Sequence, residues 1–300
     1  MSNPAFSTNP AFSEKARRNE ARQGAQQQYG QQQYGQQQYG RPQYGQQAPA
    51  GAPQYNAPNP EQLGAMYDRP SAGSVDTNRL SYDGVIMKTL ATLGVCALMF
   101  VVGLTFPVVA IPAAIVGFVL ALILIFRKKP SAPLTLAYGA AQGLFAGGLS
   151  HMVEYGMGLP GIIFQALLAT AAVFAVTLFL YSFRIVRVTP KFTRFFMIAL
   201  GGYALFSLVN FVLMITGVNQ DPWGLRSAEV FGIPLGLLLG GLAVLLGAYS
   251  LMIDFNGVEE GVKRGVPAAF GWTAAFGITM TVVWLYVEIL RIIAIIRGSN

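Results

Sequence analysis

Long apolar segments alternate with short polar ones from about residue 85 to the end of the chain. A helix that spans a bilayer needs about 20 mostly apolar residues, and seven segments approach that length. They cover roughly residues 85–105, 108–126, 134–154, 160–183, 193–217, 229–253 and 272–296. Stretches rich in Pro, Gly or charge, such as RKKPSAP and NGVEEGVKRGVP, separate them and are typical helix ends. The pattern predicts an all-α polytopic membrane protein with seven transmembrane helices.

The first part of the chain has a different pattern. It repeats QQQYG three times and is rich in Gln, Gly, Pro and Tyr, with few aliphatic residues. Such a segment buries too little apolar surface to offset the entropy lost on ordering. We therefore expect residues 1–80 to be a disordered tail and residues 81–300 to be the seven-helix membrane domain.

Composition and charge agree with this division. The chain is 53% hydrophobic and 11% charged, which is typical of a membrane protein. We therefore expect its apolar segments to contact a lipid bilayer. The basic excess lies in the apolar part, which favours a role in membrane orientation over nucleic-acid binding. With the tail inside, ten of the thirteen basic residues after position 84 fall on the cytoplasmic side.

We accordingly expect a multi-pass protein of the cytoplasmic (plasma) membrane with a cytoplasmic tail. Arg291 and Arg297 then fall on the outer side, which leaves open whether the last helix fully crosses.

Two series of glycines recur at intervals of four residues, namely Gly139, Gly143 and Gly147, and Gly232, Gly236 and Gly240. This spacing places each series on one helix face, where another backbone approaches closely. Both series predict tight helix packing.

Two acids lie at or near membrane depth, where a charged side chain costs about 2.5 to 3.5 kcal/mol. Glu288 lies inside the last segment, and Asp254 directly follows the sixth. As a pair they would change charge near physiological pH and attract a cation when deprotonated. The alternatives are a local pair of Glu288 with Arg291, three residues on, and a position of Asp254 at the helix–water boundary.

Catalytic groups are scarce. The one histidine, His151, follows Ser150, but adjacent residues on a helix point about 100° apart, and one cysteine with one histidine makes no ordinary zinc site. We expect neither an enzyme nor a bound cofactor.

The motifs IDFNGVEEGV at residues 253–262, LYVEIL at residues 285–290 and IIRG at residues 295–298 resemble those of the Bax inhibitor-1-like family. The likeness extends over about residues 75–300 and is greatest to the bacterial branch with a long polar tail. It implies a pH-sensitive calcium leak in which two acids, here Asp254 and Glu288, form a hydrogen-bonded pair. This pair would take up and release H⁺ and contact Ca²⁺ transiently. It further implies that Arg127 latches Asp254.

The spacing leaves one choice open, because a gap-free alignment on the closing motif places Thr281 opposite Asp254 instead of Glu288.

Two functions follow as hypotheses. The first is a calcium or other cation leak gated by the carboxylates. The second is a non-conducting scaffold that uses its tail to regulate membrane proteases or stress-response partners.

Overall fold

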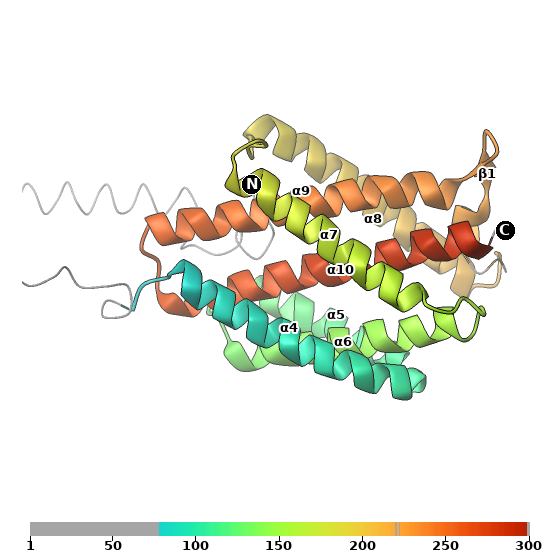
Figure 1. The fold of residues 1–300 in the computed structure, drawn as a ribbon, viewed down its shortest axis with the longest axis horizontal. Helices are drawn as coiled ribbons and strands as arrows, with labels where there is room; N and C mark the ends of the chain where they lie inside the picture. Colours follow the sequence, from blue (N-terminus) through green and yellow to red (C-terminus); the bar gives the residue numbers. More distant parts are fainter. Residues whose placement is uncertain (1–77, 220, 222, 299–300) are drawn as a thin grey trace, which may run out of the picture. The chain divides into compact units, whose positions relative to one another are not determined.

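The computed structural model describes residues 78–219, 221 and 223–298, so the predicted tail lies almost wholly outside the described residues. Seven long helices make up most of the described chain (Figure 1). They are α4 (Tyr82–Thr105), α5 (Ala110–Phe126), α6 (Ala132–Glu154), α7 (Ile162–Ser182), α8 (Pro190–Ile215), α9 (Leu235–Lys263) and α10 (Gly271–Gly298).

Short elements connect the long helices. They are the 3-10 turns η2 (Pro107–Val109), η3 (Gly224–Ser227) and η4 (Ala268–Phe270), and the strands β1 (Glu229–Val230) and β2 (Ile233–Pro234). The two strands pair as an antiparallel hairpin between α8 and α9. Each predicted segment therefore corresponds to one long helix.

The predicted bounds of the sixth segment are wrong at both ends. Its first residues form the β1–β2 hairpin, and α9 then continues through the polar stretch to Lys263. Ion pairs four residues apart, Lys263 with Glu259 and Arg264 with Glu260, support this extension. Val258 is also buried there against α10 residues such as Ala274 and Ile278. The helix stops only at Gly265, which has a φ of 62°.

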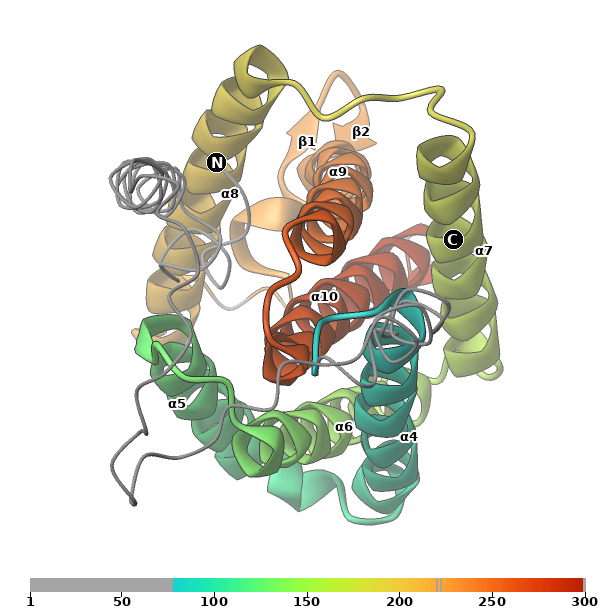
Figure 2. The ribbon, with the colours of Figure 1, turned by 90° about the vertical axis from the view of Figure 1, so that its left-hand side faces the viewer.

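Helix α10 occupies the middle of the helical unit (Figure 2). It packs against α9, α4, α7 and α6, and its buried residues contribute to three apolar clusters of the described chain. The start of α4 meets the loop before α10, where the Leu80 amide donates to the Val266 carbonyl at 2.7 Å. A side chain near the centre of α10 is therefore surrounded by protein.

The first glycine series forms the expected close packing between α6 and α4. A Cβ atom on Gly143 would lie 2.1 Å from the carbonyl oxygen of Cys96, and one on Gly147 would lie 2.0 Å from that of Phe100. The two backbones approach so closely because these side chains are absent.

The prediction of tight helix packing from the second glycine series is correct in part. Gly236 and Gly240 contact Ile295 and Ile292 of α10, so they do mark a helix interface. Gly232 is not helical and instead occupies the hairpin turn with a φ of 77°. The prediction fails there because four-residue spacing carries no information on where a helix begins.

Within the described chain, six helical stretches are long and apolar enough to cross a membrane. They contain α4, α5, α7, α8, α9 and α10, and large apolar side chains are exposed along their outer faces. A lipid bilayer is the environment that suits such a surface. Helix α6 is not among the six, since small residues such as its four glycines take the place of larger apolar ones.

Candidate functional site

Glu288, near the middle of α10, is a carboxylate with only 3% of its surface exposed. Arg291 lies three residues on and donates from Nη1 to both carboxylate oxygens, at 3.0 and 2.9 Å. The hydroxyl of Tyr203 on α8 donates to Oε1 at 2.5 Å, and the indole of Trp284 does so at 3.3 Å. Glu288 is thus held by a local ion pair and by a contact with a second helix.

A second guanidinium reaches the same cluster from the turn η3. Arg226 is 7% exposed, and its Nη2 donates to the Tyr203 hydroxyl at 3.1 Å and to Ser207 Oγ at 2.9 Å. It also lies over the rings of Tyr203 and Phe206. Tyr203 therefore accepts a hydrogen bond from Arg226 and donates one to Glu288, which links the loop to α10.

Asn210, near the end of α8, positions the loop that carries Arg226. Its Oδ1 accepts from the Leu225 amide at 2.6 Å, and its Nδ2 donates to the Trp223 carbonyl at 3.4 Å. Gly224 has a φ of 61°, and a Cβ there would lie 2.3 Å from Asn210 Oδ1. The close approach and the positive φ both favour glycine at this position.

Asp254 on α9 is completely buried, with 0% exposure. The Thr281 hydroxyl of α10 lies 3.0 Å from Asp254 Oδ2, 3.1 Å from the Gly277 carbonyl and 3.4 Å from Ser250 Oγ. The expectation that Asp254 marks the helix–water boundary is wrong. Because α9 continues for nine residues beyond it, Asp254 faces the interior instead of the helix end.

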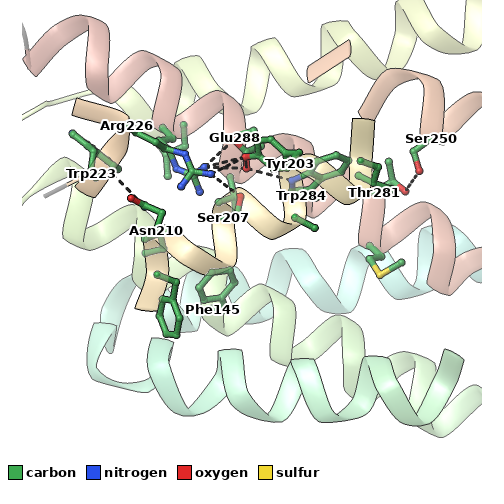
Figure 3. Close-up of a pocket in the computed structure, with 18 of the residues that line it drawn as sticks. Phe145, Tyr203, Ser207, Asn210, Trp223, Arg226, Ser250, Thr281, Trp284 and Glu288 are labelled. Atoms are coloured by element: carbon green, nitrogen blue, oxygen red, sulfur yellow. Dashed lines mark hydrogen bonds and ion pairs between the residues drawn. The ribbon is translucent and has the colours of Figure 1, made fainter. Parts of the chain in front are cut away.

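One cavity of about 750 Å³ extends along these groups between α6, α8, α9 and α10 (Figure 3). Thr281 and Ser250 line one part of it, and Glu288, Arg291 and Arg226 line another. The remaining wall is largely apolar. The polar residues beside Asp254 and the cluster around Glu288 therefore face one continuous space.

The two predicted acids have different partners. Asp254 meets Thr281, which precedes Glu288 by seven residues, or about 10 Å along the axis of α10. Among the described residues, the hydrogen bonds of Glu288 go to Tyr203, Trp284 and Arg291, and none joins it to Asp254. The structure thus contains the local pair with Arg291, and it places Thr281 opposite Asp254.

Arg127, the expected latch, follows α5. Its Nε donates to the carbonyl of Lys129 at 3.1 Å, and its side chain is exposed. Within the described chain, no hydrogen bond or ion pair joins it to Asp254. The structure therefore does not bring the expected latch residue to the acid.

The sequence pattern pointed to neither Tyr203 nor Arg226, which lies in the connection between the fifth and sixth predicted segments. A Tyr within an apolar segment is unremarkable by its pattern. Tyr203 and Glu288 are 85 residues apart, so only the packing of α8 beside α10 reveals the contact. The sequence did offer one signal for the loop that carries Arg226, namely Asn210, a polar residue inside an apolar segment.

The described residues contain no group of three or more His, Cys, Asp or Glu side chains arranged to hold a metal ion. Calcium takes six to eight oxygen ligands when it is bound stably. The expectation that Asp254 and Glu288 meet Ca²⁺ transiently stays a prediction.

The helices and the buried polar cluster define a multi-pass helical membrane protein. A family model described as Bax inhibitor 1 like matches residues 3–298, and the chain belongs to this family. Neither the search of curated proteins nor that of solved structures returned a match.

Proposed function

We propose that this protein is a pH-sensitive cation leak of the cytoplasmic membrane, with Ca²⁺ as a transported ion. One observation supports the proposal above all others: Glu288 is a buried carboxylate on the wall of the cavity between α6, α8, α9 and α10. Ionisable groups at membrane depth are costly and commonly mark ion or proton pathways. The proposed activity requires neither catalysis nor a bound cofactor.

The charges around the cavity indicate the sign of the pH response. Arg226 and Arg291 carry two positive charges at one end of the cavity, ionised Glu288 carries a negative charge beside them, and ionised Asp254 carries another beside Thr281, farther along the cavity. When both acids are protonated, the two positive charges remain and repel an entering cation. Cation flux is therefore proposed to fall as the pH falls.

The proposed topology has seven crossings, with the tail inside and the C-terminus outside. Ten basic residues in or near the helix ends on the same side as the tail support the inside position of the tail. Helix α10 contains 28 residues, about 42 Å at 1.5 Å per residue, which exceeds the hydrocarbon thickness of about 30 Å. Helix α6 is less apolar than the other six, but it packs against α4, α5 and α10, so much of its surface would face protein instead of lipid.

The latch role of Arg127 remains part of the proposal. In this conformation Arg127 bonds to Lys129, so a contact with Asp254 would belong to another state. Arg127→Gln is then expected to change the pH midpoint of the flux, whereas the adjacent change Lys128→Gln should not.

The test is calcium flux into liposomes that contain the purified full-length protein, measured against pH with an enclosed indicator. Asp254→Asn with Glu288→Gln imitates the protonated state and is expected to lower flux at mildly alkaline pH and to flatten the profile. Glu229→Gln is the matched control, since Glu229 is an exposed acid on the hairpin. An unchanged profile in the double variant would rule out gating by these acids.

The scaffold hypothesis is separated by deleting residues 1–75. Flux that survives the deletion supports the leak. Absence of flux in both forms, with loss of membrane-protein partners on deletion of the tail, supports the scaffold.

A further inference from the structure

The cluster around Glu288 has more positive than negative charge. Arg226 and Arg291 face one carboxylate, and Arg291 forms the ion pair with it. Arg226 is 7% exposed and forms no ion pair within the described chain. A buried charge without a countercharge is costly, so this end of the cavity favours one further negative charge.

Arg226 also has unused hydrogen-bond donors. A guanidinium carries five N–H groups, and within the part of the chain that the structure describes only Nη2 donates, to Tyr203 and Ser207. Among the described residues, the fully enclosed polar side-chain atoms without a partner are the hydroxyls of Thr89 and Thr279. The Nε and Nη1 groups of Arg226 are therefore not sealed inside the protein, and Arg226 lines the cavity.

The rest of the cavity wall suits an apolar body. Leu149 and Val153 of α6 face it from one side, and Met197, Leu200 and Phe211 of α8 from another. Its volume of about 750 Å³ lies within the range of about 300 to 1,000 Å³ that is typical of small-molecule sites. An apolar chamber with a cationic end matches a ligand with an anionic head and an apolar chain.

We propose that this cavity binds a single-chain amphiphile with a carboxylate head, such as a long-chain fatty acid. The carboxylate lies against Arg226, because a guanidinium fork matches the two carboxylate oxygens. The chain lies between α6 and α8. A single negative charge balances the excess of the cluster, and a single chain is the part that needs the apolar volume.

Tryptophan fluorescence allows a direct test, because two of the three tryptophans, Trp223 and Trp284, line the cavity. The probe is 9,10-dibromostearate, whose bromines quench nearby indoles, added to the purified full-length Trp272→Phe protein in detergent. We expect saturable quenching by the acid and only weak, non-saturating quenching by its methyl ester. This readout does not depend on ion flux, so its failure and that of the proposed leak are distinguishable.

Arg226→Gln is expected to weaken binding about tenfold or more, the factor for losing a charge-assisted contact. Arg194→Gln is the control and should leave binding unchanged. Arg194 is an exposed arginine of α8 and is not among the residues that line the cavity. Should Arg226→Gln fail to fold, Ala204→Leu narrows the cavity with the arginines intact and is expected to weaken binding as well. Its control is Leu205→Phe, at a position that is 63% exposed.

Equal saturable quenching by the acid and its methyl ester, or equal binding by wild type, Arg226→Gln and Ala204→Leu, would overturn the proposal. A two-chain brominated phosphatidylglycerol forms the last arm. If it binds in an Arg226-dependent way while the fatty acid does not, the site takes a phospholipid headgroup and the single-chain assignment is wrong.

Discussion

At the level of single residues, the ion pair of Glu288 and Arg291 makes a testable statement about stability. Removing one partner of a buried pair leaves the other charge uncompensated, at about 3 to 5 kcal/mol for full burial. Arg291 keeps 21% of its side chain exposed, and Tyr203 still bonds Glu288. Arg291→Gln is therefore expected to lower the free energy of unfolding by up to about 3 kcal/mol.

Adding Glu288→Gln to Arg291→Gln removes the uncompensated charge, so the double variant should recover part of the loss. Unfolding of the purified protein in mixed micelles by added denaturing detergent measures all three variants. A double variant that is less stable than Arg291→Gln by the full cost of Glu288→Gln would show that the two residues do not interact.

At the level of elements, the pairing of α4 with α6 depends on the missing side chains of the glycines between them. The added methyl group of Gly143→Ala would meet the Cys96 carbonyl of α4 at 2.1 Å, and a backbone atom cannot move aside without shifting its helix. We expect a loss of about 1 to 3 kcal/mol in unfolding free energy, as for other overpacked interiors. The micelle titration used for the ion pair measures it.

The control for this change has the opposite expected sign. Gly201 lies within α8, and a Cβ there would meet nothing within 4 Å. Gly201→Ala should be neutral or should stabilise by up to about 1 kcal/mol, through helix propensity. Equal losses in both variants would contradict the packing argument.

For the whole molecule, the number of membrane crossings depends on α6. It has 23 residues, about 34 Å in length, which is sufficient to cross a hydrocarbon core of about 30 Å. Cysteines placed singly at Lys129, before α6, and at Met157, after it, should react with an impermeant maleimide from opposite sides. Cys96→Ser provides the background, since Cys96 is the one native cysteine.

Labelling of both positions from the same side would mean that α6 does not cross and that the tail and the C-terminus share a side. Such a result would contradict seven crossings, while leaving the helix packing described above unchanged.

Much of the fold was predictable because a bilayer makes strong demands on local sequence. Every backbone polar group in lipid must be satisfied within its own helix, so the mostly apolar segments located all seven helices, although α6 is less apolar than the other six. The glycine spacing also predicted that α6 packs closely on a neighbouring helix, although only the structure identifies that helix as α4. The end of α9 was not, because its polar last turns depend on ion pairs and on the burial of residues such as Val258 against α10.

The candidate site divides in the same way. Asp254 and Glu288 stand out as acids in apolar surroundings, and the pair of Glu288 with Arg291 follows from spacing within one helix. Their other partners depend on how the helices rotate and slide against one another. Thr281 meets Asp254 across α9 and α10, and Tyr203 joins Glu288 to Arg226 from a third helix and a loop. Apolar pattern sets which segments enter the membrane, whereas only packing decides which buried charges meet.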